Sequence, residues 1–551
     1  MSRRIKIGIA VALVAGSVAF AFSPPGERYF EIAKSLDIFA TLFKEVNGYY
    51  VDEVDPKKLI NTGINGMLES LDPYTDYIPE ENIEAFSIQT TGQYAGIGAL
   101  IGVINKKVVI TEPYEGFPAQ RAGIRVGDEL ISVDGTSVMG KGTTESSALL
   151  KGKAKTDVEV VVRRAGQKDD LHFRITREKI KISNVVYQNI IGSDIGLIKL
   201  NDFTPGAGKE VEEAVVKLKE KGAKKIILDL RDNPGGLLYE AVNIVNVFIP
   251  KGLEVVNTKG KVQEWNKLYM TLNSPVDTEI PVAVLTSSGS ASAAEIVAGS
   301  LQDYDRAVLI GQRTFGKGLV QTTRQLAYNA QLKITTAKYY IPSGRCIQAL
   351  DYTHRKTDGT VEKVADSLKS EFKTKSGRKV FDGGGLDPDI AVTDEFVGTI
   401  TANLVTMGYL FDYASLYCGE HPNAPESLRK FTLSDADFSR FASWLKERNF
   451  TYTSELEKET ESLIAAARNE RVYDDIQQQL SAIKSKIAEN HANDLNRFKP
   501  EVKRLLEQQI GFHYRLSAGQ IDVALGYDPE ILEAQKILSG LPSYKKLLSP
   551  H

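Results

Sequence analysis

The stretch PVAVLTSSGSASAAEIVAGSLQDYDRAVLIGQRTFGKGLVQ, residues 281–321, decides how this chain folds and where its chemistry lies. An apolar run at 282–285 predicts a buried strand, and a helix is predicted to begin at about Ser292. A second buried strand at 307–310 leads into the glycine-rich turn RTFGKG. Strand, helix and strand in this order bring free N–H groups at a helix N-terminus to the edge of a sheet. Two side chains of this stretch are able to do chemistry there, Ser292 and Lys317.

Two simpler interpretations compete for these residues. Ser292 with Glu295 three positions later forms a capping box, and on the local pattern alone a plain helix cap is favoured over a nucleophile. The run GQRTFGKG nearly matches a phosphate-binding loop. However, Gly318 stands where that loop needs a hydroxyl for Mg²⁺, and LVQT after it predicts a strand, so nucleotide binding is disfavoured.

A family resemblance reverses the preference for a plain cap. The segment from SGSASAAEIVAG to TFGKGLVQ resembles the active site of the carboxy-terminal processing peptidases, also called tail-specific proteases. The resemblance implies that Ser292 is the nucleophile, that Lys317 is the general base and that Gln321 orients the lysine. Ala294 departs from the pattern, because many members carry another serine there, but this change leaves the Ser/Lys pair intact.

The distribution of histidines agrees with a lysine base. A serine that attacks an amide needs a neighbouring base, usually histidine, yet no histidine lies between His172 and His354. An ordinary lysine pKa near 10.4 must fall by roughly 2–3 units, or ~3–4 kcal/mol, for the amine to act near neutrality. We expect burial against Phe315 and the apolar strands to cause this fall.

The DLRDNPGG motif, residues 229–236, is similar to the oxyanion loop of the same family. By resemblance, the backbone N–H groups of Gly236 and Ala293 form the oxyanion hole, and one such donor typically lowers the barrier by ~3–4 kcal/mol. A Pro-Gly turn without chemistry is the simpler reading of the motif alone. Alternating strands and helices over 182–392 predict an α/β protease core. The resemblance makes this core a crotonase-like α/β spiral.

Residues 92–178 change to short strands and resemble an inserted PDZ domain of the circularly permuted bacterial kind, with AQRAGIRVGDELISVDG as its hallmark. Its carboxylate-binding loop corresponds to Gly96, Ile97, Gly98 and Ala99. Glycines let the backbone approach a terminal carboxylate closely, and the ligand then adds as a strand. An ordinary turn is the alternative for GIG taken alone.

The flanking segments carry no catalytic motif. Residues 28–88 and 394–551 have helical patterns, which predict helical N- and C-terminal regions that pack as a shell or against a second subunit. The polar residues 356–379 predict an exposed or partly disordered loop. Basic residues before an apolar run predict a secretory signal over 1–22, with an uncleaved membrane anchor as the alternative.

Composition limits the remaining functions. A formal charge of −3 over 551 residues gives no electrostatic reason to expect nucleic acid. The six histidines and two cysteines show no metal-ligand spacing, so we expect neither a metal nor a cofactor. Cys346 and Cys418 are free or paired on this evidence.

We therefore expect an exported serine endopeptidase of the periplasm or cell envelope that captures apolar C-terminal tails and cleaves with a Ser/Lys dyad. A homo-oligomer and an N-terminal membrane tether are further expectations. A catalytically inactive PDZ scaffold or quality-control binder is the alternative, and an acyl-CoA enzyme of the crotonase type is a weaker third.

Overall fold

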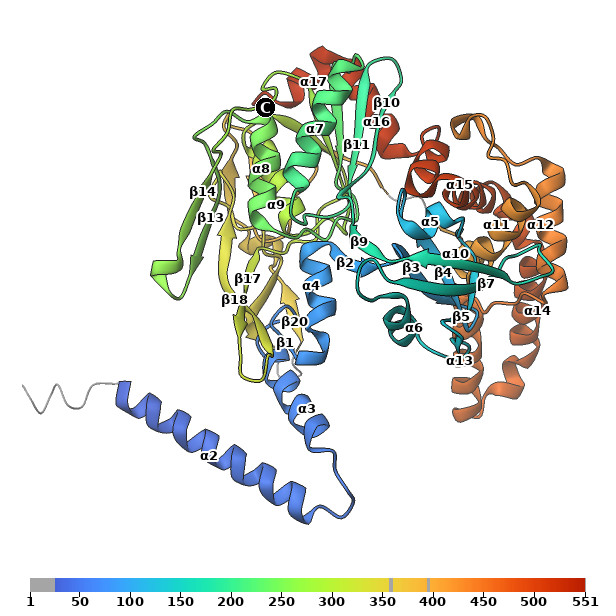
Figure 1. Cartoon of the computed structure of the whole chain (residues 1–551), viewed down its shortest axis with the longest axis horizontal. Coiled ribbons are helices and arrows are strands. Elements are labelled where there is room, and N and C mark those ends of the chain that lie inside the picture. Colours follow the sequence, from blue (N-terminus) through green and yellow to red (C-terminus); the bar gives the residue numbers. More distant parts are fainter. Residues whose placement is uncertain (1–24, 356–359, 394–396, 551) are drawn as a thin grey trace, which may run out of the picture. The chain divides into compact units, whose positions relative to one another are not determined.

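A computed structural model of the chain describes residues 25–355, 360–393 and 397–550. The chain divides into two compact units, residues 1–77 and 78–551, which we describe separately (Figure 1). The predicted signal or anchor at 1–22 lies outside the described residues. Among the helices that the structure does describe, none combines the length and apolar character needed to cross a membrane.

The first unit contains the long helix α2 (Pro25–Tyr49) and the shorter helix α3 (Pro56–Glu69), as the helical pattern predicted. Helix α3 begins cleanly because the Asp55 carboxylate accepts hydrogen bonds from the backbone N–H groups of Lys57 and Lys58 at 2.9 and 3.2 Å. Both helices expose large apolar side chains: Tyr29, Phe30, Ile32, Leu36, Ile38, Phe39, Leu42 and Met67.

The second unit is built on a six-stranded sheet in the order β10-β11-β12-β15-β16-β23. Strands β10 and β11 are antiparallel, and the remaining neighbours are parallel. The strands span Val185–Ile191, Ile195–Leu200, Lys225–Asp229, Val282–Thr286, Ala307–Gly311 and Ile390–Ala391. The prediction of an α/β core is confirmed.

Helices cover both faces of this sheet. On one face pack α7 (Ala207–Glu220), α8 (Leu238–Phe248) and α9 (Ala293–Asp303). On the other face pack α16 (Pro529–Ser539) and α17 (Leu541–Leu547) from the end of the chain. The central strands are apolar on both sides for this reason: they bury alternate residues in the two cores. The last helices thus belong to the body of the α/β unit.

A second, antiparallel sheet lies beside the first and carries the residues that follow Lys317. Strand β18 (Gln331–Tyr340) pairs with β13 (Glu254–Gly260) and with β17 (Leu319–Gln325), and β14 (Lys267–Met270) pairs with β13. Residues 356–379 were predicted to be a loop. In the described part, residues 360–379, that prediction is wrong, because the chain forms short strands there. Residues from 360 onward form the short strands β20 (Val361–Lys363), β21 (Glu371–Lys373) and β22 (Lys379–Phe381). These polar strands are too short to show an alternating pattern.

The inserted β domain has its own core and a sheet in the order β3-β4-β5-β7-β8. Its strands span Ala99–Ile104, Lys107–Pro113, Glu129–Val133, Asp157–Arg163 and Leu171–Thr176. Strand β2 (Gln93–Gly96) pairs with β9 (Glu178–Lys181) where the domain joins the core. Helix α6 (Thr143–Leu150) packs against β3, which is an edge strand.

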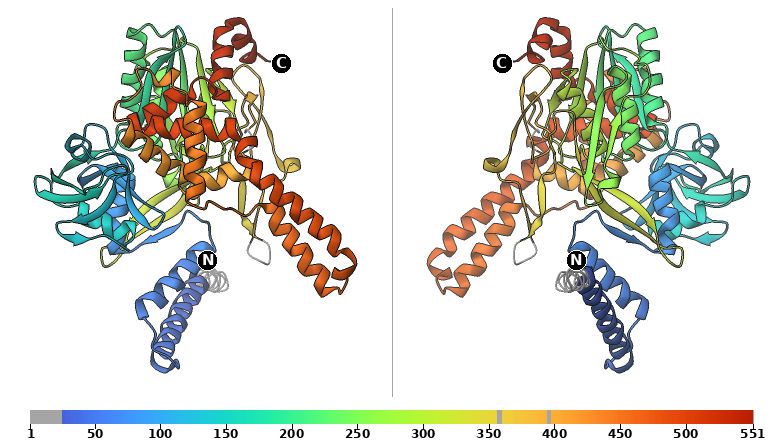
Figure 2. Two further views of the ribbon diagram at one scale, coloured as in Figure 1. Left: turned by 90° about the vertical axis from the view of Figure 1, so that its right-hand side faces the viewer. Right: turned by 90° about the vertical axis from the view of Figure 1, so that its left-hand side faces the viewer.

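The C-terminal region is helical, as predicted. It begins with α10 (Thr399–Thr406), α11 (Tyr409–Glu420) and α12 (Asp435–Glu447), and α15 (Lys499–Ala524) precedes α16. The charged stretch at 454–490 is divided into two helices, α13 (Glu455–Asn469) and α14 (Tyr473–Arg497), which lie side by side (Figure 2). Cys346 and Cys418 are both free thiols.

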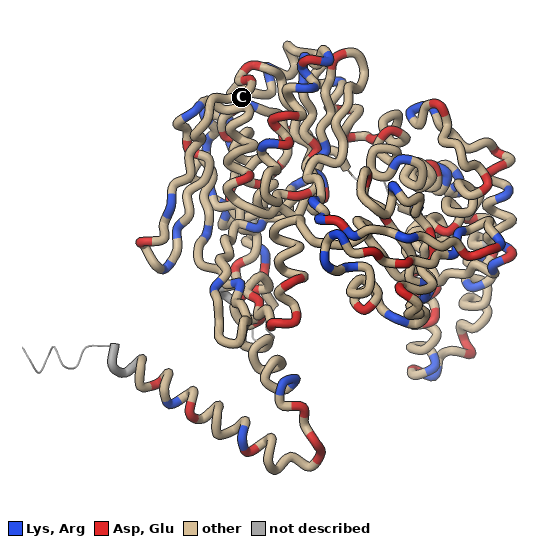
Figure 3. Tube along the Cα trace, in the orientation of Figure 1, with Lys and Arg blue, Asp and Glu red and all other residues tan. Residues whose placement is uncertain are grey.

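Acidic and basic residues are interspersed along the described chain, which matches the small net charge of −3 (Figure 3). Among the residues that the structure describes, no group of three or more His, Cys, Asp or Glu side chains is placed to hold a metal ion.

The packing of α16 on the sheet gives a first prediction. Leu538 is fully buried in the core between helix and sheet, whereas Leu532 of the same helix is 42% exposed. Leu538→Ala should lower the free energy of unfolding by about 2–5 kcal/mol, because it leaves a cavity. Leu532→Ala should change it by less than about 1 kcal/mol. Denaturant unfolding measures both, and equal losses would show that α16 does not pack as described.

Candidate active site

Ser292 lies at the N-terminus of α9, at the end of the loop that follows β15. Its φ and ψ of 55° and −113° fall outside the regions that L-residues normally adopt. Hydrogen bonds of Ser290 fix the loop before it: the Ser290 hydroxyl donates to Leu230 O, at the end of β12, at 2.7 Å and accepts from Ser287 N at 2.9 Å. Strained backbone of this kind clusters at functional sites, since the rest of the fold must enforce it.

A cavity of about 440 Å³ opens beside Ser292. This volume lies in the range of small-ligand sites, roughly 300–1,000 Å³. Its wall contains all five residues that the sequence placed in the protease site: Ser292, Ala293, Lys317, Gln321 and Gly236. Strands and helices far apart in the chain therefore bring the predicted site together, although its chemical roles stay predictions.

The loop of the DLRDNPGG motif runs directly past Ser292. Gly235 has φ 92°, and a Cβ placed on it would lie 2.7 Å from Ala293 N and 2.9 Å from Ser292 Cβ. Only glycine fits at such an approach. The next residue, Gly236, is held by Phe203, whose carbonyl accepts from Leu237 N at 2.9 Å. The backbone of this loop thus lies against the helix end where the oxyanion donors are predicted.

A fully buried carboxylate, Glu295, connects the two predicted catalytic residues. Its Oε2 accepts hydrogen bonds from the backbone N–H groups of Ser292 and Lys317, both at 2.9 Å. Its Oε1 accepts from the Thr314 hydroxyl at 2.5 Å and from Gly316 N at 2.8 Å. Burial raises the pKa of Glu295, although these four hydrogen bonds act against the rise. The capping-box pattern found this residue but predicted only a local cap.

Tyr339 makes a second connection that the sequence did not reveal. Its hydroxyl lies 2.6 Å from the carbonyl oxygen of Lys317 and 3.1 Å from that of Ser292. The side chain is 1% exposed and extends from β18. Glu295 therefore holds the N–H groups of the two residues, and Tyr339 lies against their carbonyl groups.

The surroundings of Lys317 differ in one respect from expectation. Phe315 is 48% exposed, so it does not supply the burial that the sequence analysis assigned to it. Apolar cavity residues do lie nearby, among them Leu319 and Val320. Gln321 shares the cavity wall with Lys317, and its amide nitrogen donates to the Thr335 hydroxyl at 3.0 Å.

The predicted carboxylate-binding loop connects β2 to the edge strand β3. Gly98 has φ 77°, and a Cβ there would lie 2.6 Å from Phe117 Cβ, so the position requires glycine. The carbonyl groups of Ile97 and Gly98 accept from Ala119 N and Tyr114 N at 2.8 and 2.9 Å, which fixes the loop. The loop is thus a tight turn with Gly96 and Ala99 at its two ends, and its role as a carboxylate site stays a prediction.

A tyrosine already faces the donors of this loop. Burial raises the pKa of Tyr94 to about 12, and the backbone N–H groups of Ala99 and Gly98 near its hydroxyl act against the rise. A ligand carboxylate at these donors would have to displace the Tyr94 hydroxyl.

The sequence matches family models and curated relatives that share one protease family. The profile of Peptidase family S41 matches residues 194–354, that of a PDZ domain matches 109–164, and that of the probable PDZ-protease C-terminal helical domain matches 400–538. A probable CtpA-like serine protease of Staphylococcus aureus (strain COL) is 35% identical over 385 residues, which cover 69% of this chain and 74% of the relative. A carboxy-terminal-processing protease of Bartonella bacilliformis is 36% identical over 358 residues, which cover 64% of this chain and 82% of the relative.

Among solved structures, the photosystem II D1 C-terminal processing protease is similar, with 25% sequence identity and a TM-score of 0.34. That match covers 69% of this chain and 97% of the other.

The position of Glu295 generates a second prediction. Glu295→Gln places an NH₂ group where a carboxylate oxygen now accepts, so at least one buried donor loses its partner. The free energy of unfolding should fall by about 1–3 kcal/mol. The control is Glu213→Gln on α7, because the Glu213 side chain is 50% exposed and its loss should cost less than about 0.5 kcal/mol. Similar small losses in both variants, measured by denaturant unfolding, would contradict the connecting role.

Proposed function

This chain belongs to the carboxy-terminal-processing serine proteases of Peptidase family S41, and we propose that it cleaves protein substrates with a Ser292/Lys317 dyad after its PDZ domain has bound their C-terminal tails. The observation that carries the proposal is the single cavity wall that contains Ser292, Lys317, Gly236 and Ala293. The alternative, an inactive PDZ scaffold, would retain the fold without needing these residues together.

In the proposed reaction, the neutral amine of Lys317 takes the proton of the Ser292 hydroxyl as Oγ attacks the scissile carbonyl carbon. The carbonyl oxygen becomes an oxyanion that accepts hydrogen bonds from Gly236 N–H and Ala293 N–H. Lys317 then gives its proton to the leaving amine, and an acyl-enzyme ester forms on Ser292. Lys317 then takes a proton from water as the water oxygen attacks the ester carbon. It returns this proton to Ser292 Oγ as the ester C–O bond breaks, which releases the carboxylic acid and restores the serine. Gln321 orients the lysine throughout.

We further propose that the core has the crotonase-like α/β spiral of this family. The parallel strands β11, β12, β15 and β16, which alternate with α7, α8 and α9 along the chain, support this assignment. An experimental structure of the core whose strand order differs from that of crotonases would refute it.

Substitution of the dyad tests the proposed reaction. Ser292→Ala and Lys317→Ala should each lower kcat on an unstructured protein with an apolar tail by at least about 10³-fold, because each removes a group that the chemistry requires. Lys338→Ala changes an exposed lysine of β18 and should leave kcat within about threefold of the wild type. Cleavage by the Ser292→Ala variant at the wild-type rate would refute the dyad.

Tail capture is supported by the edge of the PDZ sheet. Strand β3 has a free hydrogen-bonding edge in the sheet order of the described residues, and α6 packs alongside it. A peptide could add to β3 as a further strand, with its terminal carboxylate at the N–H groups of Ile97, Gly98 and Ala99. The Tyr94 hydroxyl that now faces two of these donors would move aside.

The competition with Tyr94 makes tail capture measurable. A peptide with an apolar C-terminus should bind at least about tenfold more weakly when its carboxylate is replaced by a carboxamide, because the charged hydrogen bonds are lost. Tyr94→Phe removes the competing hydroxyl and should strengthen binding by about fivefold, the equivalent of ~1 kcal/mol. Fluorescence anisotropy with both peptides measures these changes. Equal affinity for the acid and the amide would exclude the loop as a carboxylate site.

Export to the periplasm or cell envelope, an N-terminal tether and a homo-oligomer complete the proposal. The basic and apolar residues at 1–22 support export. The apolar side chains exposed on α2 and α3 support association with a second copy. Cell fractionation and light scattering of the purified protein test these points. A cytosolic protein would refute export, and a monomer would refute the oligomer.

A further inference from the structure

We propose that Asp528 and Glu530, at the start of α16, are positioning residues for the peptidase reaction, because they hold Arg231 and thereby the loop that presents Gly236. This inference rests on the proposed function and extends it to the C-terminal helices. Neither carboxylate lines the cavity beside Ser292, so neither is placed to contact a substrate there, and their contact with the catalytic loop is through Arg231.

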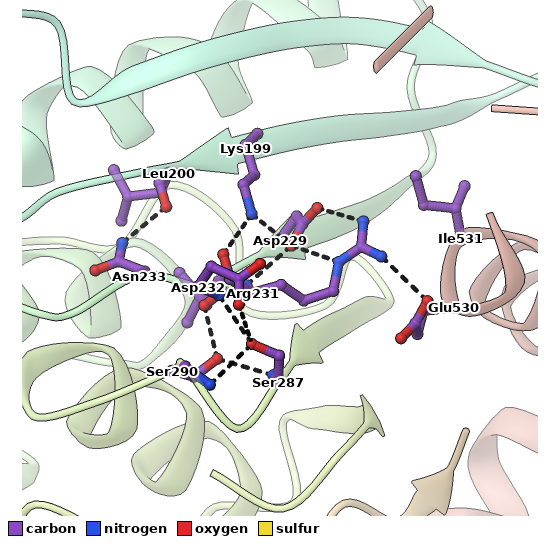
Figure 4. A network of polar contacts seen from close by, with 12 residues as sticks. Lys199, Leu200, Asp229, Arg231, Asp232, Asn233, Ser287, Ser290, Glu530 and Ile531 are labelled. Atoms are coloured by element: carbon purple, nitrogen blue, oxygen red, sulfur yellow. Dashed lines mark hydrogen bonds and ion pairs between the residues drawn. The ribbon is translucent and has the colours of Figure 1, made fainter. Parts of the chain in front are cut away.

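The Arg231 guanidinium is shared between the core and the C-terminal helix (Figure 4). Its Nε and Nη2 donate to the two oxygens of Asp229 at 3.0 and 2.7 Å. Its Nη1 donates to Asp528 Oδ1 at 3.0 Å and to Glu530 Oε2 at 3.1 Å. Side-chain exposure is between 5 and 17% in all four residues. Ion pairs this buried are little screened by water or salt, and removal of one partner leaves a charge without compensation.

The C-terminal helix adds negative charge to a cluster with two cations. Lys199 also contacts Asp229, at 3.2 Å, and donates to the backbone carbonyl of Arg231. Without α16, these two cations would face one buried carboxylate. With it, they face three, and the two carboxylates that α16 provides come from a segment almost 300 residues further along the chain.

The loop after Arg231 transmits its position to the site, because the next residues are fastened to the serine loop. Asp232 N donates to Ser287 Oγ at 2.9 Å, and Ser287 Oγ donates to the Asp232 carboxylate at 2.9 Å. Asn233 accepts from Ala291 N at 2.9 Å through its carbonyl oxygen. A displaced Arg231 would therefore pull on the turn directly before Ser292.

The same asparagine also fixes the glycines. Its side-chain oxygen accepts from Gly235 N at 2.8 Å, and its side-chain nitrogen donates to Leu200 O at 2.7 Å. Only Pro234 and Gly235 separate Asn233 from the donor predicted at Gly236. Displacements of about 1 Å at a catalytic group can cost ~10²-fold in rate.

Helix α16 is a firm support for this contact. Asp528 is its N-cap: Oδ1 accepts from Ile531 N and from Arg231 Nη1, both at 3.0 Å, and Oδ2 lies 2.9 Å from the same Nη1. Ile531, Ala534 and Leu538 anchor the helix on the apolar face of the sheet. Both acidic side chains are also favourably placed at a helix N-terminus.

The experiment uses the full chain and variants that preserve shape. Asp528→Asn keeps an N-cap residue, Glu530→Gln keeps the side-chain volume, and a third variant combines both. Glu533→Gln is the matched control, because Glu533 lies on the same helix and pairs with Lys536 at the surface. We measure kcat and KM on an unstructured tailed substrate, the inhibition constant of a peptide boronate, and the thermal midpoint. The boronate forms a tetrahedral adduct with a serine oxygen and so reports on the oxyanion donors.

The double variant should have a kcat about tenfold lower than wild type, with KM within about twofold, and should bind the boronate about tenfold more weakly. The control should match the wild type in every measurement. A double variant with the control's kcat would overturn the inference. So would a kcat loss that is fully explained by unfolded protein at the assay temperature, or one that appears only in KM. If the wild type cleaves nothing, or Ser292→Ala cleaves normally, the proposed function fails, and the inference fails with it.

Discussion

The buried carboxylate of Glu295 is the constraint on which the site depends. It binds the backbone N–H groups of Ser292 and Lys317 with one oxygen, so two loops that lie 25 residues apart in sequence cannot move independently. Tyr339 meets the carbonyl groups of the same two residues. A serine in a strained conformation needs this kind of support, because the preferred backbone geometry would turn its side chain elsewhere. The predicted pair is thus held through its backbone, and both residues line the cavity.

The sheet makes this arrangement possible, and helices from the middle and from the end of the sequence stabilise the sheet. Its strands β12 and β15 end beside one another, so the loops that follow them, with Gly236 and Ser292, meet at the same edge. Helices α7, α8 and α9 bury one face, and α16 and α17 bury the other. A core that ended near residue 392 would leave an apolar face open to water. The C-terminal helices are therefore part of the structural unit that carries the site, rather than a separate attachment.

The sequence predicted most of this organisation, for reasons that can be named. Buried strands and the helix after Ser292 showed clear periodicity. The family resemblance predicted site roles for Gly236, Ala293, Lys317 and Gln321, and the structure places these residues in the wall of one cavity. Contacts between residues far apart in the sequence could not be predicted from such local patterns. Glu295 was recognised through its spacing from Ser292, but its bonds to the residues around Gly316 depend on tertiary structure. The partner of Arg231 lies almost 300 residues away, and no periodic pattern marks such a pair.

The two buried carboxylates, Asp229 and Glu295, have different electrostatic surroundings and different pKa shifts. Asp229 is compensated by cations: although burial opposes it, Arg231 and Lys199 hold its pKa well below the usual range, so it stays charged and fixes the loop. Glu295 has only dipoles as partners, and burial raises its pKa. A charged Glu295 beside Lys317 would favour the ammonium form, which cannot accept the serine proton. The Thr314 hydroxyl, which donates to Glu295, also accepts from Leu386 N at 2.7 Å, so a protonated Glu295 could donate to the same oxygen and would place no negative charge at the backbone of Lys317. The raised pKa of this carboxyl group is therefore in the direction that a neutral lysine base requires.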